Sequence, residues 1–514
     1  MDQNHLEQTK RIARNTLFLY GRMFLGMLIS LYTSRLILEG LGIIDYGIYG
    51  VVGGLVGMLS LVSSALSSSI SRFITFELGT GNKENLKKVF ATSIIIQIAM
   101  SVAVLIVGET LGLWFVNTQL TIPADKIYAA NWVYQASMLA FVLGLLQCPY
   151  SALLVAYEKM NVFAYFGILD LVFRLFIALF LVYAPFQYDH LIIYSLACVA
   201  WGMMMQGIYF RYCTKNFEVT HTKLKFDKSY WKKMLGFSTW NGIGCTAGIL
   251  KDQGVNILLN IFFGPVVNAA RSIGYQVTGA ITSFAGNFMT ALVPQITKSY
   301  SAGDIPYTFS LVYRGSRFSY YIMIILAVPI LLYTPYILKI WLGVFPDYSI
   351  QFVRLVIILA LVDILSNTLI TLQNANGNIR NYQLAVGTTL FLNFPLSWLA
   401  LKSGCNPLSV YYVAICVGVA CLFLRLAFLR KTVGLPMLDY LKSVVGNVMV
   451  VTIMTFIFPT MIWYIMGSTS FLSLICASLV SLLWGGTVVL FIGCTTNERI
   501  FIMSRLPILK RFAR

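Results

Sequence analysis

The sequence predicts an all-helical protein that crosses a membrane fourteen times, as two six-helix lobes followed by two further helices. Three observations lead to this fold class. Hydrophobic residues make up 58% of the chain and charged residues only 11%, unlike an ordinary soluble domain. Apolar runs of the length that a bilayer requires, about 20 residues each, recur from end to end. The chain also matches itself after a shift of 222 residues, which takes Gly42 to Gly264.

The expected spans follow one another along the chain, and polar or charged loops separate them. We expect no cleavable signal peptide, because the first span is too long and lacks a small-residue cleavage site. No loop is large enough to fold as a separate soluble domain. In order, the fourteen spans are 15–38, 47–71, 89–112, 129–153, 162–183, 190–210, 235–261, 268–293, 316–333, 350–373, 382–401, 407–429, 442–465 and 470–493.

The internal repeat rests on landmarks as well as on shared glycines. In both copies a long apolar helix ends at a glycine turn, a more polar helix follows, and a polar loop closes with Gly81-Asn82 or Gly303-Asp304. The alternative is a chance match between two hydrophobic sequences, but four glycines align after the shift, which is more than chance alone would align. Many secondary transporters build a central site between two such halves. The matched residues are Gly26, Gly42, Gly57, Gly81 and Ile74-Thr75 with Gly248, Gly264, Gly279, Gly303 and Ile296-Thr297.

The net charge of +18 follows the membrane topology, since alternate loops are basic and the intervening loops carry few cations. The positive-inside rule then places both termini in the cytoplasm, which requires an even number of spans. The basic surplus attracts anionic membrane lipids, and we expect no nucleic-acid partner. The nine scattered cysteines lack any Cys-x-x-Cys pair, so we expect neither disulfides nor a metal site.

A polar, basic segment between the sixth and seventh spans divides the chain into lobes. No nucleotide-binding loop of the G-x-x-x-x-G-K-[ST] type and no Ser/His/Asp arrangement can be read, so an enzyme is not favoured. The predicted divisions are 1–216 for the first lobe, 217–233 for the linker, 234–431 for the second lobe, and 432–514 for the last two helices and a basic cytoplasmic tail.

Charged side chains inside apolar spans usually face a cavity or a partner, because burying them in lipid is unfavourable. Arg22 lies about two turns inside the first span, with Asn15 on or near its face; snorkelling to the headgroups is the alternative. Asp170 and Arg174 are one helical turn apart, so they either line a cavity or tie helices together. Arg35 and Arg271 are the other cationic candidates.

Polar side chains concentrate on the second helix of each repeat. Small hydroxyl residues also serve as glue for close helix packing, so a structural role stays open for them. Polarity at matching depth in both copies favours the walls of one water-filled cavity. The candidates are Ser60, Ser64 and Ser67 in the first copy, and Gln276, Thr282 and Asn287 in the second.

Two carboxylates in the second lobe are candidates for ion coupling, and we expect no other cofactor. Asp252 and Asp363 could take up H⁺ or Na⁺, since a buried acid has a raised pKa and a buried carboxylate attracts cations. For Asp252, a salt bridge with Lys251 is the alternative.

Several short motifs stand out in the two halves of the chain. They are Arg14-Asn15, Arg35, 45–49 (DYGIY), 71–73 (SRF), 77–79 (ELG), 268–270 (NAA), Gln276, Asn287, 294–297 (PQIT) and Gly303-Asp304. These motifs resemble the Wzx-type polysaccharide repeat-unit flippases of the MOP superfamily, which also contains MATE exporters and MurJ lipid II flippases. The resemblance implies two six-helix lobes around a V-shaped cavity. It implies that an oligosaccharide on undecaprenyl pyrophosphate moves from the cytoplasmic to the periplasmic leaflet of a bacterial inner membrane, with polysaccharide polymerase machinery as a possible partner.

The resemblance also assigns roles to some candidates. By position, Arg22, Arg271 and Arg35 correspond to arginines that meet the anionic head of the substrate. Asp252 and Asn393 correspond to Na⁺ ligands of the MurJ-like branch, although Ser397 stands where that branch has an acid.

Three alternatives stay open. A MATE-type cation-coupled exporter usually has twelve helices and an acidic cavity, whereas this chain offers cavity arginines. A membrane polysaccharide polymerase or O-antigen ligase usually carries a large external loop, which we do not find here. Export of teichoic-acid-like glycopolymers is the third.

For a flippase, the transported repeat units would belong to capsule, lipopolysaccharide O-antigen or exopolysaccharide.

Overall fold

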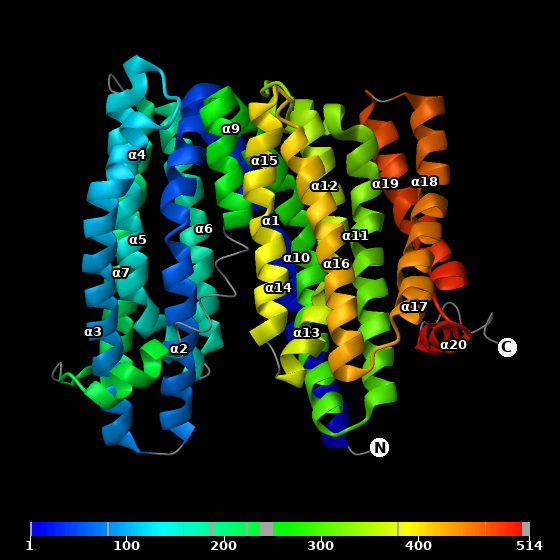
Figure 1. The fold of residues 1–514 in the computed structure, drawn as a ribbon, viewed down its shortest axis with the longest axis horizontal. Coiled ribbons are helices and arrows are strands. Elements are labelled where there is room, and N and C mark those ends of the chain that lie inside the picture. Colours follow the sequence, from blue (N-terminus) through cyan, green and yellow to red (C-terminus); the bar gives the residue numbers. More distant parts are fainter. Residues whose placement is uncertain are drawn as a thin grey trace. The chain divides into compact units, whose positions relative to one another are not determined.

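A computed structural model describes residues 3–79, 82–157, 159–184, 189–222, 225–236, 250–377, 380–467 and 469–505. These residues form helices joined by short connections, with no β-strand among them (Figure 1). The chain divides into two compact units, Met1–Ala269 and Ala270–Arg514, and helix α10 begins in the first unit and continues into the second.

In the first unit, α5 is the central element. It packs against α7, α2, α3 and α1, while α6 packs against α1. The helices are α1 (Gln3–Gly57), α2 (Ser60–Gly79), α3 (Lys83–Val107) with the π-helical turn η1 (Gly108–Gly112), α4 (Leu113–Thr118), the 3₁₀ turn η2 (Ala124–Lys126), α5 (Ile127–Ala156), α6 (Met160–Tyr183), α7 (His190–Asn216), the 3₁₀ turn η3 (Glu218–Thr220), a helical segment at 228–236, the π-helical turn η4 (Leu250–Gly254) and α9 (Val255–Phe263).

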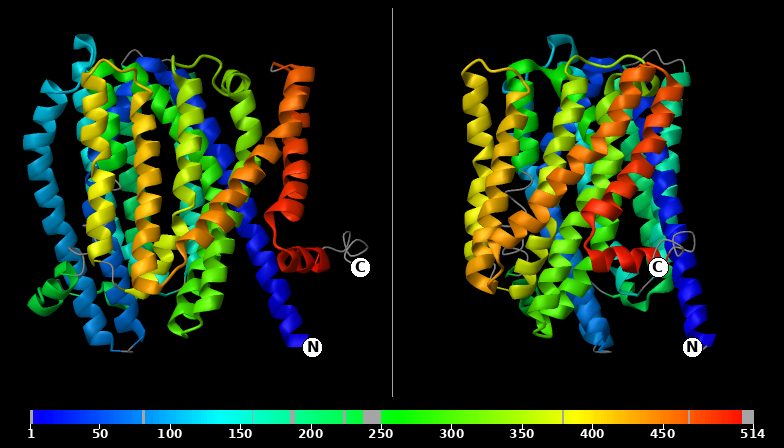
Figure 2. Two further views of the ribbon diagram at one scale, coloured as in Figure 1. Left: turned by 45° about the vertical axis from the view of Figure 1, so that its right-hand side comes forward. Right: turned by 90° about the vertical axis from the view of Figure 1, so that its right-hand side faces the viewer.

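In the second unit, α11 and α16 organise the packing. Helix α11 contacts α12, α18 and α19, and α16 contacts α12, α14 and α15. The short α20 runs across the direction of α18 and α19 (Figure 2). The helices are α10 (Pro265–Ser301), α11 (Ile305–Leu342), α12 (Ser349–Ile364), α13 (Asn367–Asn376), α14 (Arg380–Phe391), α15 (Asn393–Lys402), α16 (Ser409–Val433), α17 (Met437–Tyr440), η5 (Leu441–Gly446), α18 (Asn447–Met466), α19 (Phe471–Val488), η6 (Val489–Gly493) and α20 (Thr496–Arg505).

Eleven helices in the described part of the chain are long and apolar enough to cross a membrane, so the all-helical, multi-pass membrane class is confirmed. Ten of them each overlap one of the expected spans, and the first, Gly26–Gly57, overlaps the expected span 15–38 and the beginning of 47–71. The other three expected spans lie at the end of α1 and in α2 (47–71), partly outside the described residues (235–261), and in α10 (268–293). The total of fourteen stays a prediction.

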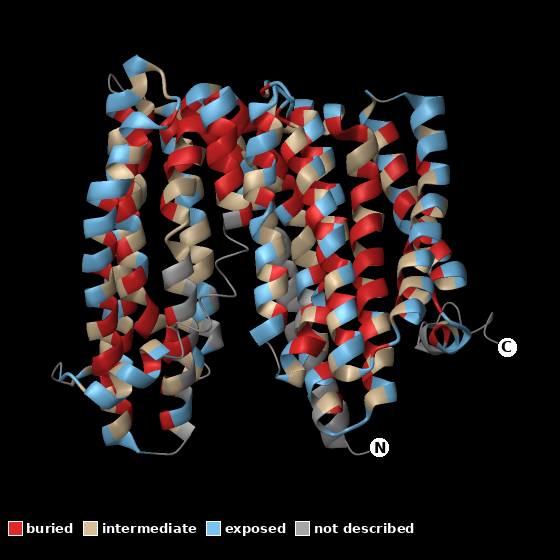
Figure 3. Cartoon of the chain, viewed as in Figure 1, coloured by how far each residue is buried: buried red, intermediate tan, exposed pale blue. Residues whose placement is uncertain are grey.

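The outward faces of the helices carry large apolar side chains. Phe176 of α6 is 62% exposed and Ile106 of α3 is 61% exposed. Figure 3 shows many exposed positions along the helices, whereas the buried residues of α11 concentrate in its middle part, between Leu311 and Thr334. Surfaces of this kind would drive aggregation in water, but they suit hydrocarbon.

The repeat is visible in the backbone. Gly42 breaks α1 with φ 77° and ψ 172°, and Gly264 separates α9 from α10 with φ 76° and ψ −175°. This combination of dihedrals is essentially restricted to glycine. Further along, the matched residues Ile74 and Ile296 are both fully buried. The two copies therefore share backbone turns and packing positions.

The third helix of each copy begins with the same cap. The Asn82 side chain accepts a hydrogen bond from the backbone N–H of Asn85 at the start of α3. At the start of α11, the Asp304 side chain accepts one from the N–H of Tyr307. Asn and Asp are favoured at this position because their side-chain oxygens satisfy a free backbone donor. Asn82 and Asp304, which close the two polar loops of the repeat, thus serve as equivalent helix starts.

The end of the predicted linker (217–233) and the residues directly after it pack against α2 where they are described. The fully buried hydroxyl of Ser69 on α2 donates to the carbonyl oxygen of Met234 at 3.0 Å. The Tyr230 hydroxyl donates to Oε1 of Glu77 at 2.9 Å, and burial raises the pKa of Tyr230 to about 12. These contacts fasten 228–236 to α2.

Candidate functional site

A cavity of about 380 Å³ lies inside the first unit, between α5, α6, α7 and the second half of α1. Small residues leave this space open, because the facing positions include Gly144 of α5, Gly167 of α6 and Gly202 of α7. Its volume falls in the range of about 300–1,000 Å³ that is common for small-molecule sites.

The wall of the cavity carries an ordered group of three polar side chains. Arg174 donates from Nε to Oδ2 of Asp170 at 2.9 Å, one turn away on α6. Trp201 of α7 donates from its indole nitrogen to Oδ1 of the same carboxylate, also at 2.9 Å. The Trp201 ring stacks on Phe173 at 3.7 Å between centroids, which fixes its orientation.

This geometry gives the two charged residues different roles. Both oxygens of Asp170 already accept a hydrogen bond, so the carboxylate is occupied as an acceptor. Arg174 uses only Nε, and no other described group accepts from its two terminal nitrogens. A guanidinium edge of this kind matches the paired oxygens of a phosphate or carboxylate. Asp170 therefore orients Arg174, which lines the cavity with a side chain that is 54% exposed.

A second polar group joins α1 to α9 within the same unit. Asn256 donates to the carbonyl oxygen of Gly50 at 3.2 Å, and Asn268 donates to both the backbone and side-chain oxygens of Asn256. The backbones approach closely here, since a Cβ on Gly47 would lie 2.0 Å from the Pro265 carbonyl oxygen. Only glycine fits at position 47.

The motif 45–49 contains an ionic bridge that the sequence did not predict. Asp45 is buried, and Oδ2 contacts the Lys126 ammonium at 2.9 Å. The same ammonium contacts Asp189 at 3.0 Å. Asp189 also caps α7, because Oδ1 accepts from the N–H of Leu191. One lysine thus joins α1 to the starts of α5 and α7.

Several predicted site residues lie on the expected helices of the first unit. Arg35 is half-buried on α1, before the break at Gly42, and Ser60 and Ser67 are half-buried on α2. The side chains of Asn15, Arg22 and Ser64 lie outside the described residues, as does that of Asn287 on α10. Their facing stays a prediction.

On α10, three further candidates are described. Arg271 is 5% exposed and lies over the ring of Tyr275, 4.2 Å from its centroid. Gln276, the residue after Tyr275, is half-buried. Thr282 donates to the carbonyl oxygen of Gly279 at 3.2 Å, within its own helix.

The coupling candidates occupy three helical elements. Asp252 is half-buried in η4 of the first unit. In the second unit, Asp363 of α12 faces α16, because a Cβ on Gly418 would lie 3.4 Å from Asp363 Oδ1. Asn393 and Ser397 lie one turn apart on α15, and both are buried.

Two buried arginines of the second unit were missed. Arg425 of α16 is 8% exposed and donates to the hydroxyls of Tyr382 and Ser366. It lies inside the expected span 407–429, so the rule that singled out Arg22 could have found it. Arg317 of α11 donates to Glu498 of α20 at 2.7 Å, and both residues are buried.

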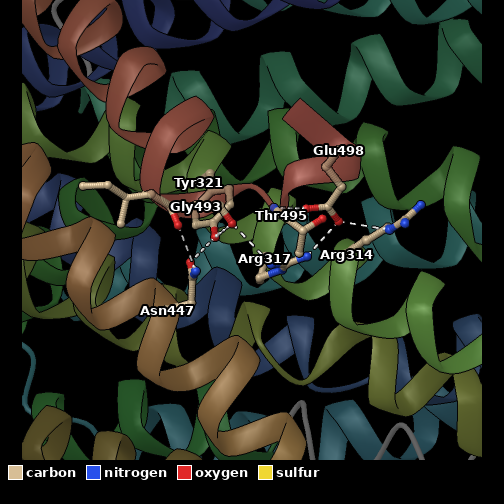
Figure 4. A network of polar contacts seen from close by, with 8 residues as sticks. Arg314, Arg317, Tyr321, Asn447, Gly493, Thr495 and Glu498 are labelled. Atoms are coloured by element: carbon tan, nitrogen blue, oxygen red, sulfur yellow. Dashed lines mark hydrogen bonds and ion pairs between the residues drawn. The ribbon is translucent and has the colours of Figure 1, made fainter. Parts of the chain in front are cut away.

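Figure 4 shows the network around Glu498. Arg314 contacts the same carboxylate at 3.0 Å, and Oε2 of Glu498 accepts from the N–H of Thr495. The hydroxyl of Tyr321 on α11 lies within hydrogen-bond distance of the Asn447 side-chain oxygen on α18 and of the Gly493 carbonyl oxygen, and it can donate to either. Polar contacts therefore fasten the last helices of the chain to α11.

These observations define a duplicated, all-helical, multi-pass membrane protein that carries charged side chains within its spans. The chain belongs to the polysaccharide biosynthesis protein family, whose model matches residues 12–300. A comparison with curated proteins finds no match.

Solved structures share the fold at low sequence identity. A lipid II flippase MurJ, described as an inward closed conformation, is 12% identical with a TM-score of 0.68, over 92% of this chain and 99% of that one. An inward-facing multidrug resistance MATE family transporter of the MOP superfamily is 12% identical with a TM-score of 0.63, over 79% and 96%. The MATE multidrug transporter DinF-BH is 17% identical with a TM-score of 0.56, over 80% and 93%.

Proposed function

We propose that this protein flips oligosaccharide repeat units, carried on undecaprenyl pyrophosphate, from the cytoplasmic to the periplasmic leaflet of a bacterial inner membrane. The observation that carries the proposal is membership of the polysaccharide biosynthesis family over residues 12–300. The fold shared with a lipid II flippase over 92% of the chain supports it. No bond is made or broken, so the protein acts as a transporter and not as an enzyme.

The physical task is to carry a charged, hydrated head across about 30 Å of hydrocarbon. Polar side chains along the path replace the lost hydration, and arginine forks match phosphate oxygens. Arg22, Arg35, Arg174 and Arg271 are the proposed anion contacts. The polyprenyl tail stays in lipid throughout. Alternating access requires only that the polar path opens to one side at a time.

We also propose that uptake of Na⁺ or H⁺ drives the cycle, through Asp252, Asp363 or Asn393. The basic segments would face the cytoplasm together with both termini. The transported substrate would be a capsule, O-antigen or exopolysaccharide repeat unit, and polysaccharide polymerase machinery would receive it after transport.

The deciding experiment follows lipid-linked repeat units in a strain that lacks this gene. We expect them to accumulate in the cytoplasmic leaflet, measured by protection of radiolabelled sugar from an external glycosidase. Arrival at the periplasmic face at the normal rate would refute the proposal.

A MATE-type exporter of organic cations is the second candidate, because a MATE transporter shares the fold with a TM-score of 0.63. Arg22→Glu separates the two. A flippase should lose transport, since the change removes an anion contact, whereas an exporter of cations should not be impaired. Lys339→Glu, a charge reversal at an exposed position, serves as the control and should preserve transport in either case.

A further inference from the structure

The segment that follows α7 folds back onto the first unit. Phe217 and Val219 are each only 4% exposed. The Phe217 ring stacks on Tyr157, at the end of α5, with 4.5 Å between centroids and 27° between planes. Glu218 lies between these two buried anchors, so its position is fixed.

The Glu218 carboxylate turns toward the start of α3 and bridges two lysines that are one turn apart. Oε2 lies 3.3 Å from the Lys83 ammonium, and Oε1 lies 3.2 Å from the Lys87 ammonium. Hydrogen bonds from Lys87 and Lys83 lower the pKa of Glu218 below its usual value. Each oxygen has its own cation, which is the arrangement that two oxygens of a phosphate would take.

A pocket of about 400 Å³ adjoins this bridge. Its wall is mixed, with the side-chain amides of Asn82 and Asn216 and the apolar Leu86 beside the lysines. The space is larger than a single carboxylate needs, and it falls in the size range of ligand sites.

The charges around the pocket balance only while Glu218 is in place. Lys83 and Lys87 contribute two positive charges, and Glu218 and Glu77 contribute two negative ones. Glu77 accepts from the Tyr230 hydroxyl, so it is held on the α2 side. The Glu218 bridge is exposed to solvent, with 65% of its side chain accessible, and exposed ion pairs hold weakly. A phosphate carries more charge and more acceptor oxygens than a carboxylate.

We propose that this pocket binds a phosphate-bearing headgroup, and that Glu218 occupies the site as an internal carboxylate until the headgroup displaces it. Displacement would free the Glu218 side chain, while the buried Phe217 and Val219 keep the backbone of the segment in place. The pocket is distinct from the arginine-lined path of the proposed transport, so binding here can be tested without a transport assay.

The test uses the full chain in nanodiscs of neutral phosphatidylcholine, titrated with inorganic pyrophosphate by calorimetry. Glu218→Gln should bind at least threefold more tightly than the wild type, because the competing charge is gone. Adding Lys83→Ala and Lys87→Ala to that variant should weaken binding at least tenfold. Lys88→Ala is the matched control, since Lys88 lies on the same helix, pairs with Glu84 and does not line the pocket.

Two results would overturn the assignment: unchanged affinity in Glu218→Gln, or equal weakening by Lys88→Ala and by the double lysine variant (Lys83→Ala with Lys87→Ala). Thermal unfolding of each variant verifies that it is folded. Nanodiscs that contain phosphatidylglycerol identify the source of the headgroup. If this lipid competes with pyrophosphate in the wild type and not in the double lysine variant, the bilayer supplies it. If the lipid does not compete and pyrophosphate still binds, the headgroup comes from a diphosphate-linked molecule.

Discussion

Gly42 and Gly264 hold the same backbone conformation at corresponding points of the two copies, with φ of 77° and 76° and ψ near 180°. Each glycine ends one helical segment and starts another. The repetition of so restricted a conformation shows that the copies share their turns as well as their pattern of apolar residues.

We expect Gly42→Ala and Gly264→Ala each to lower the free energy of unfolding by about 1–3 kcal/mol, since a side chain is strained in this conformation. No neighbouring atom would clash with either new methyl group, so the loss is one of backbone strain alone. Thermal unfolding in detergent measures it. Gly207→Ala is the control, because its site in α7 is helical and open. It should be neutral or stabilising by up to about 1 kcal/mol, and equal losses at all three sites would contradict the explanation.

Gly47→Ala should destabilise the contact between α1 and the start of α10. The new methyl would lie 2.0 Å from a backbone oxygen of Pro265, so the helices must move apart. Overpacking of this kind lowers stability by about 1–3 kcal/mol. Gly53→Ala, six residues further along α1, meets no atom within 4 Å and should be tolerated. If unfolding temperatures and transport of the two variants agree, the close approach has no energetic importance.

Asp170→Ala should lower the unfolding free energy by about 1–2 kcal/mol. It removes the Trp201 hydrogen bond, worth about 0.5–1.5 kcal/mol, and a partly exposed ion pair, worth about 0.3–0.5 kcal/mol. Trp201→Phe removes the same hydrogen bond and leaves a smaller ring against Phe173, but it keeps the ion pair, so we expect it to lower the unfolding free energy by no more than Asp170→Ala does. Denaturant unfolding measures both. A larger loss for Trp201→Phe than for Asp170→Ala would show that ring packing, not the carboxylate, organises the cavity wall.

Glu498→Gln should destabilise the attachment of α20, because Arg317 is left buried without its counter-ion. Removing one partner of a buried pair costs about 3–5 kcal/mol. In this variant, trypsin should cleave faster after Arg499, and the unfolding temperature should fall. The control is Glu498→Gln combined with Arg317→Met, which should recover part of the loss. If the two changes are simply additive, the pair contributes no coupling.

The docking of Glu218 should depend on pH. The folded-state pKa of Glu218 lies below its ordinary value, so the contribution of the bridge is complete above the ordinary pKa of about 4.3 and disappears as the pH falls through the lowered folded-state value. The unfolding temperature of the wild type, compared with that of Glu218→Gln at each pH, should show a small wild-type advantage at neutral pH that vanishes in acid. A difference between the two proteins that stays constant with pH would disprove the mechanism.

Sequence patterns predicted the fold class and the landmarks of the repeat because both are local requirements. The positive φ at positions 42 and 264 requires glycine. The unpaired backbone N–H groups at a helix start favour Asn82 and Asp304, and burial in lipid requires long apolar runs. The Asp170–Arg174 pair was visible for the same reason, since one helical turn separates the two residues.

The remaining polar contacts depend on segments that meet only after folding. Glu218 reaches Lys83 across 135 residues, and Asp45 reaches Lys126 across 81. The spacing of residues along a single helix or loop cannot predict such pairs. The cavity in the first unit arises in the same way, because three small residues on three helices must face one another.

The Arg317–Glu498 pair also sets an order of events during synthesis. Glu498 is made 181 residues after Arg317, which takes on the order of 10–40 seconds at ribosomal rates of about 5–20 residues per second. Throughout that interval α11 carries a guanidinium whose counter-ion does not yet exist. Insertion of α11 and final closure around Arg317 are therefore separate stages, and a chain that stops before residue 498 leaves Arg317 without its counter-ion.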